Sequence, residues 1–148
     1  MKKNTVVLKN YLNNFGEFVA ASVITPGQFV EITSEGKVQR LTTDGAAIPI
    51  LAIEDNLQGK DIHDDYAIGD QVQVWFPQRG DEAYVLLTDG QNVAVGDALG
   101  SSGTGSVEKV TGESGSVATG ALAQVVDAID LSGSSATEID DHVCVRIL

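Results

Sequence analysis

Short runs in which apolar and polar residues alternate dominate the chain, and no long run follows the 3.6-residue period of an amphipathic helix. Clear examples are QVQVWF at residues 71–76 and VCVRIL at residues 143–148. Successive side chains of a strand point to opposite faces, so each run predicts a strand with one buried face. The pattern therefore predicts an all-β fold, either a small antiparallel β-barrel or a β-sandwich.

Turn residues divide these runs into predicted hairpins. In residues 29–42, FVEITSEGKVQRLT, two alternating runs flank a short Ser-Glu-Gly turn. In residues 71–87, the runs QVQVWF and EAYVLL flank a loop from Pro77 to Asp81. Because Pro77 cannot donate to a strand ladder and Gly-Asp favours a turn, this stretch also predicts a hairpin. In contrast, IPILAIE at residues 48–54 is nearly all apolar, which indicates a strand covered on both faces.

Three segments share one design, in which an apolar residue precedes Gly plus Asp or Gln and a strand-like run follows. They are residues 24–32, 66–76 and 93–101. Glycine permits the backbone angles of a tight turn, so each segment predicts a turn that leads into a strand. Residues 121–130, ALAQVVDAID, fit both a helical face and a strand; the all-β context favours the strand.

The only tryptophan, Trp75, stands with Gln71 and Gln73 on the less apolar face of its predicted strand. A tryptophan on a polar face often anchors a protein interface, which makes Trp75 a candidate contact between subunits. Ordinary packing inside one subunit is the alternative.

The net charge of −12 argues against a nucleic-acid partner, yet the amino terminus is basic. No acidic residue precedes Glu17. We therefore expect an extended N-terminal arm over residues 1–22, followed by a single β-rich domain over residues 23–148. The residues expected to contact a partner combine positive charge with aromatic rings, and they are Lys2, Lys3, Lys9, Tyr11, Phe15 and Phe18. Lysines that only aid solubility, a disordered tail and an ordinary first strand are the alternatives.

Both histidines lie beside carboxylates, in DIHDD at residues 61–65 and DDH at residues 140–142. These residue types are ligands of divalent metals, but ligands must converge in space. Both runs lie between predicted strands, where charged loops are expected. We interpret them as solvated loops and expect no metal and no cofactor, with a metal site as the alternative.

The sequence has no clear catalytic motif. Gly100, Gly103 and Gly105 lack the Lys-Ser/Thr of a phosphate loop, and no G-x-S-x-G nucleophile elbow is present. The single cysteine, Cys144, excludes an internal disulfide and alternates within a predicted strand, so we interpret it as a small buried residue. We expect a protein that is not an enzyme. Apolar runs are too short for a signal peptide or a membrane span, so we also expect a soluble protein without a membrane partner.

Three stretches in a fixed order carry a family resemblance. They are GKDI (59–62) followed by YAIGD (66–70), the loop PQRGD (77–81), and VGD (95–97) followed by ALGSSG. Together with the strands around them, over about residues 23–148, they resemble the capsid cement, or head decoration, proteins of tailed bacteriophages.

The resemblance implies a small β-rich virion protein that is made in the host cytoplasm and binds the outer surface of an icosahedral capsid. Its partner would be the major capsid protein, whose neighbouring subunits it would bridge and stabilise, commonly as a homotrimer. The resemblance transfers no individual binding residue. A carbohydrate- or receptor-binding module on a virion or cell surface is the alternative function, and a small enzyme is a third.

Overall fold

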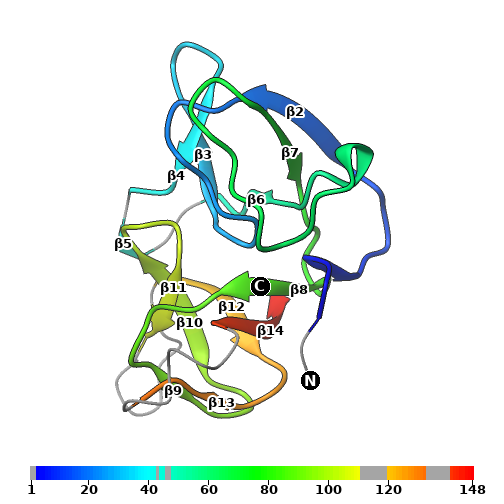
Figure 1. Ribbon diagram of the computed structural model, residues 1–148. Coiled ribbons are helices and arrows are strands. Elements are labelled where there is room, and N and C mark those ends of the chain that lie inside the picture. Colours follow the sequence, from blue (N-terminus) through cyan, green and yellow to red (C-terminus); the bar gives the residue numbers. More distant parts are fainter. Residues whose placement is uncertain (1–2, 43, 46–47, 111–119, 133–140) are drawn as a thin grey trace.

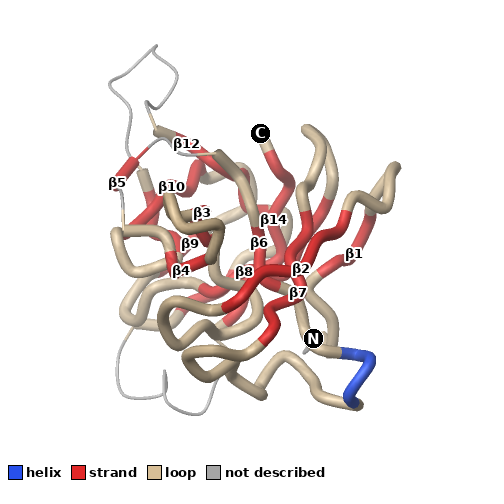
Figure 2. The backbone as a smooth tube through the Cα atoms, turned by 90° about the horizontal axis from the view of Figure 1, so that it is seen from above, coloured by secondary structure: helices blue, strands red, loops and turns tan. Residues whose placement is uncertain are grey.

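The computed structural model describes residues 3–42, 44–45, 48–110, 120–132 and 141–148. Nearly all of its regular structure is β-strand (Figure 1), and the strand ladders are antiparallel. Among the described residues, one 3₁₀ turn, η1 (Asn56–Gln58), is present and lies at the periphery (Figure 2). The predicted all-β fold class is confirmed, and its arrangement resembles a β-sandwich.

The largest sheet has the strand order β1-β8-β14-β12-β10-β11, with β5 paired to β10. Leu87, just after β8, forms an isolated parallel bridge with Val107, so the sheet curves back toward itself. Within the described residues, no ladder closes the sheet into a barrel. Its strands are β1 (Val7–Lys9), β5 (Asp44–Gly45), β8 (Glu82–Leu86), β10 (Ala98–Ser102), β11 (Val107–Lys109), β12 (Ala121–Val125) and β14 (His142–Ile147).

A second, smaller sheet has the order β2-β7-β6 and lies above the largest sheet in Figure 1. The hairpin of β3 and β4 is on the same side, while β9 pairs with β13 at the opposite end. These strands are β2 (Phe15–Val19), β3 (Val30–Ile32), β4 (Val38–Arg40), β6 (Leu51–Ala52), β7 (Gln71–Trp75), β9 (Asn92–Val93) and β13 (Ile129–Asp130).

Two hydrophobic clusters form the core, and strands β6 and β7 contribute to both. Val74 packs in the smaller cluster, whereas the next residue, Trp75, packs in the larger one. Leu51 and Ala52 divide between the two clusters in the same way. The prediction for residues 48–54 is a strand covered on both faces. Strand β6 confirms it at Leu51 and Ala52, whereas Ile48 is 75% exposed.

The predicted hairpin over residues 71–87 is wrong. Strand β7 pairs with β2 and β6, while β8 pairs with β1 and β14, so the two strands belong to different sheets. The loop between them carries the chain from one sheet to the other. It is fastened by the buried Asp81, whose carboxylate accepts the N–H of Gln78 at 2.8 Å, and by the N–H of Gly80, which donates to the carbonyl of Ile147 at 2.8 Å.

Other local predictions are confirmed. Residues 29–42 contain the antiparallel hairpin β3-β4. The ambiguous segment at 121–130 begins with strand β12, and the carboxyl terminus forms β14 beside it. The predicted turns at 25–28, 67–70 and 94–97 share one geometry: the side chain of the fourth residue accepts the backbone N–H of the first at 3.0, 2.9 and 2.9 Å. Gly27, Gly69 and Gly96 have φ of 97°, 93° and 91°, which only glycine adopts readily.

Candidate contact surface

The described part of the N-terminal segment, residues 3–22, runs along both sheets. Strand β1 pairs with β8 of the largest sheet, and β2 pairs with β7 of the second sheet. Just before β1 begins, Val6 is fully buried in the larger cluster. The segment therefore shares its hydrogen bonds with the body, so only its exposed side chains are candidates for contact with a partner.

A short loop, residues 10–14, joins β1 to β2 and is held at both ends. The N–H of Tyr11 donates to the Asp81 carboxylate at 3.3 Å, and the N–H of Phe76 donates to the carbonyl of Asn14 at 2.8 Å. The side-chain amide of Asn10 donates to the carbonyl of Leu12 at 3.2 Å. The loop is thus fixed against the crossover at residues 77–81, and its side chains are presented from an anchored backbone.

Large apolar side chains of this loop and of the start of β2 face solvent. Tyr11 is 91% exposed, Leu12 is 55% exposed and Phe15 is 46% exposed. The other exposed large apolar residues of the described chain are spread along the sequence. The three residues lie within five positions of one another in the sequence, which makes them a candidate surface for contact with another molecule. We call Tyr11, Leu12 and Phe15 the contact loop.

The structure brings only some of the predicted contact residues to this surface. Lys9 is exposed beside the contact loop, and its ammonium lies 3.8 Å from the Glu82 carboxylate. Lys3 is partly buried, and Lys2 lies outside the described residues. Phe18 does not belong to the surface, because it packs on the smaller cluster with its ring 6.5 Å from that of Phe76, edge to face.

Sequence reasoning missed Leu12. A signal was present, because Leu12 is the one aliphatic residue in YLNNF, where polar neighbours leave no alternation that would bury it. From the sequence, only aromatic rings are predicted as anchors there, although an exposed leucine contributes apolar area in the same way.

Trp75 is not at the surface, so the predicted subunit contact is corrected. Its side chain is 0% exposed and packs in the larger cluster. It faces Leu51 on one neighbouring strand and Phe15 on the other, because β7 is the central strand of its sheet. The polar appearance of its face came from Gln71 and Gln73, which lie nearer the solvent end of the strand. Within the described residues, the Trp75 indole N–H has no hydrogen-bond partner.

The two histidines have different environments. His63 is exposed, in agreement with a solvated loop, but the same expectation for His142 is wrong. His142 is buried, stacks on Tyr84 at 5.1 Å, and places Nε2 2.8 Å from the carbonyl of Pro26. Its Nδ1 lies 3.2 Å from Asp141, and this contact lowers the pKa of the Asp141 carboxyl. His142 therefore fastens β14 to the turn at 25–28.

Neither the histidine runs nor the cysteine forms a reactive group in the described part of the chain. No three side chains of His, Cys, Asp or Glu gather there in the way that a metal ion requires. Cys144 is buried in β14, as predicted. Burial, and then the neighbouring Asp127, raise the pKa of its thiol to about 11, so the nucleophilic thiolate is scarce near neutral pH.

Across the described residues, no helix has the length and apolar character needed to cross a membrane.

No protein-family model and no curated protein matches the sequence. Among solved structures, the chain is similar to the head fiber gp8.5 N base of bacteriophage phi29. The TM-score is 0.57 at 15% sequence identity, and the similarity covers 93% of this chain and 95% of that chain. A likeness at this identity shows that the two chains share a fold.

Proposed function

We propose that the protein is a structural component of a tailed-phage virion that binds the outer surface of the capsid. In this role it bridges neighbouring major capsid subunits and stabilises the shell. The work is contact between proteins, so it requires no catalytic group and no cofactor.

The observation that carries the proposal is the fold shared over almost the whole of both chains with the base of a phage head fiber. That protein is named for an appendage of a phage head. The similarity is independent of the stretches at 59–62, 66–70, 77–81 and 95–97 that resemble cement proteins, because it rests on the course of the backbone. Two separate lines thus favour a protein of the phage head.

The contact loop supports the same role. Tyr11, Leu12 and Phe15 are exposed on a backbone that is already fixed by its hydrogen bonds to the body. An anchored backbone loses little conformational entropy on binding, so less of the free energy of binding is lost to ordering the loop. The neighbouring Lys9 adds a positive charge that favours an acidic partner surface.

We further propose that the protein acts as a homotrimer. Strands β1 and β2 stand at the ends of their sheets, and an exposed strand edge readily pairs with another chain. A closed cyclic assembly covers such edges without growing into a fibre. Three copies would also present three contact loops, and their linkage would raise avidity about 10²–10⁴-fold if all engage together.

The test is to mix the purified protein with undecorated capsids from its own source and to image the particles by electron cryomicroscopy. The proposal expects extra density at regular positions on the outer surface, with threefold shape, and a higher temperature of capsid disruption. Light scattering on the free protein measures its oligomeric state separately.

Capsids without added density, at protein concentrations far above the number of sites, would contradict the capsid role. Monomers both in solution and on the shell would contradict the proposed trimer but not the proposed capsid role. Binding to glycans without binding to capsids would favour a carbohydrate-binding module instead.

A further inference from the structure

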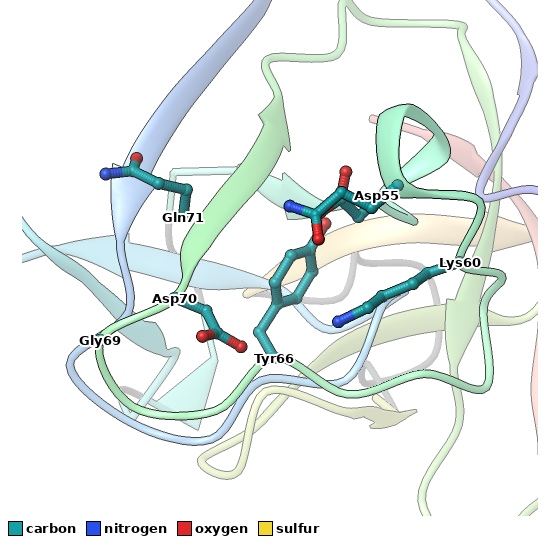
Figure 3. Close-up of a pocket in the computed structure, with 7 residues that line it drawn as sticks. Asp55, Lys60, Tyr66, Gly69, Asp70 and Gln71 are labelled. Atoms are coloured by element: carbon teal, nitrogen blue, oxygen red, sulfur yellow. The ribbon is translucent and has the colours of Figure 1, made fainter.

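A surface pocket of about 240 Å³ lies between the turn η1 and the turn at 67–70 (Figure 3), and no residue of the contact loop lines it. Its size is below that of pockets for drug-sized ligands, which begin near 300 Å³, and fits a single small ring. Its lining is mostly polar and comprises Asp55, Gln58, Lys60, Tyr66, Gly69, Asp70 and Gln71.

The floor of the pocket is fixed by Tyr66. Its hydroxyl donates to the carbonyl of Ile53 at 2.7 Å and accepts the N–H of Gln73 at 3.4 Å, while its backbone forms a bridge with Ile24. Burial, ahead of the nearby carboxylates, raises the pKa of the Tyr66 hydroxyl to about 12, so the group stays neutral. The floor is therefore a rigid and uncharged surface.

The walls are also preformed. On one side, the carbonyl of Asp55 accepts the N–H of Gln58 at 3.2 Å and the N–H of Lys60 at 3.1 Å, which fixes the η1 turn. On the other side, the Asp70 carboxylate accepts the N–H of Ala67 at 2.9 Å and closes its turn. In Figure 3 the Lys60 and Asp70 side chains extend from opposite sides toward the space beside the Tyr66 ring. Little ordering is needed before a ligand can bind.

Asp55 is the feature that points to a ligand. The residue is only 6% exposed and lines the pocket, where Figure 3 places it beside the upper end of Tyr66. It precedes η1, yet its side chain does not cap the turn, and no donor among the described residues reaches the carboxylate. Its oxygens reach the water of the pocket, and a ligand that donates hydrogen bonds would take the place of that water.

The charges in the pocket restrict what that ligand can be. Two carboxylates, Asp55 and Asp70, repel an anion. The Lys60 ammonium repels a cation, and a calcium ion would need six to eight oxygen ligands. Acceptors on Asp55 and Asp70 together with donors on Gln58 and Lys60 match a neutral molecule with several hydroxyl groups, each of which both donates and accepts.

We propose that this pocket binds one neutral sugar ring, with adjacent hydroxyl groups donating to Asp55 and Asp70 and accepting from Lys60. The sugar ring lies against the small exposed part of Tyr66 that lines the pocket. The inference does not depend on the capsid role, because none of these residues belongs to the contact loop. On a virion surface, such a pocket would give weak attachment to glycans, which many copies would strengthen.

The test uses the full-length protein labelled with ¹⁵N and the methyl glycosides of glucose, galactose and mannose as probes. The proposal expects at least one glycoside to shift backbone amide signals of residues 55–60 and 66–71 in a saturable way. Asp55→Asn should weaken that binding about tenfold or more, which corresponds to about 1.4 kcal/mol. Because the Asp55 carboxylate has no partner to lose, this variant should fold as the wild type does and still bind capsids.

Asp65→Asn is the matched control, because it removes an exposed carboxylate from the same loop but outside the pocket, and it should leave sugar binding unchanged. Lys60→Met is a second variant, expected to weaken the binding while leaving the fold intact. Equal binding by Asp55→Asn and wild type would overturn the proposal, as would glycosides that shift none of these amides.

Three further probes test whether the pocket prefers an acidic sugar, a cation or a basic protein segment to a neutral sugar. Glucuronic acid should bind more weakly than methyl glucoside, since its carboxylate meets Asp55 and Asp70. Saturable shifts of the same amides by calcium chloride alone would instead make the pocket a cation site. Shifts by N-acetylarginine amide, without shifts by any sugar, would make it a contact for a basic protein segment. Either of these results would overturn the sugar proposal.

Discussion

The buried carboxylate of Glu54 accepts the backbone N–H of Val6 at 3.0 Å, across 48 residues of sequence. The same carboxylate accepts the hydroxyl of Thr5 at 2.6 Å. Val6 is the last residue before β1, so these two bonds fasten the start of the N-terminal segment to the body. The position of the contact loop, a few residues later, depends on this attachment.

Glu54→Ala should therefore lower the free energy of unfolding by about 1–3 kcal/mol, because it leaves the buried N–H of Val6 without a partner. Urea denaturation followed by circular dichroism measures the change. Glu35→Ala is the control: Glu35 is exposed and its ion pair with Lys37, at 3.7 Å, lies at the surface, so its loss should change stability by less than about 0.5 kcal/mol. If Glu54→Ala and Glu35→Ala are equally stable, the hydrogen bonds of Glu54 do not fasten the N-terminal segment to the body.

The elements that could be predicted from sequence are those whose pairing is local. The hairpin at 29–42 and the turns at 67–70 and 94–97 are encoded within a few residues, by alternation and by glycine. The partner of β7 is not encoded in this way. An alternating run looks the same whether it pairs with the next strand or with a strand fifty residues earlier, and β7 pairs with β2.

The candidate site residues also differ in whether they could be predicted from sequence. Those whose exposure depends on nearby residues could be predicted, and those whose position depends on distant residues could not. Tyr11 and Phe15 could be predicted because aromatic residues among asparagines have little chance of burial. Trp75 could not be placed, since its burial depends on Leu51 and Phe15, which flank it on two other strands. The pocket also escaped prediction, because Asp55 and Asp70 lie on separate turns that only the fold brings together.

The burial of Trp75 has a spectroscopic consequence that is simple to measure, since the chain has one tryptophan. Its fluorescence should be shifted to short wavelength in the native protein and be poorly quenched by acrylamide. Urea should shift the emission to longer wavelength together with the loss of circular dichroism. Decoration of capsids should leave the quenching unchanged; strong quenching in the free protein that capsids then suppress would restore Trp75 to the interface.

Acid should destabilise the protein through the turn at 94–97. The N–H of Ala94, and then Lys109, lower the pKa of the Asp97 carboxyl below its ordinary 3.8. A pKa that is lower in the folded state means that the stabilisation is present above pH 3.8 and is lost as the pH falls through the folded-state pKa. Asp97→Asn should therefore be less stable than the wild type at neutral pH, and this difference should shrink below pH 3.8.

Urea midpoints of the wild type and Asp97→Asn, measured from neutral pH to below pH 3.8, test this prediction. The ion pair of Asp97 with Lys109, at 3.1 Å, would be lost in the same step, so high salt should reduce the difference at neutral pH only in part. A difference that stays constant from neutral to acid pH would show that the Asp97 carboxylate does not control the acid response.

The contact loop predicts which single change should weaken capsid binding without affecting the fold. The Tyr11 side chain is almost fully exposed, so Tyr11→Ser should change the free energy of unfolding by no more than about 0.5 kcal/mol. On a capsid the same change removes an aromatic anchor, and affinity should fall about thirtyfold, the effect of a typical interface hot spot of about 2 kcal/mol. Binding to undecorated capsids at several protein concentrations measures the loss.

Val95→Ser is the matched control for Tyr11→Ser, because Val95 is also an exposed apolar residue but lies at the turn before β10, outside the contact loop. It should bind capsids as the wild type does. Lys9→Gln should weaken binding less than Tyr11→Ser, and mainly at low salt, where the attraction of Lys9 to an acidic surface is least screened. If Tyr11→Ser and Val95→Ser bind equally well, the capsid contact lies on another face. If Val95→Ser alone loses binding, the turn at 94–97 rather than the contact loop faces the shell.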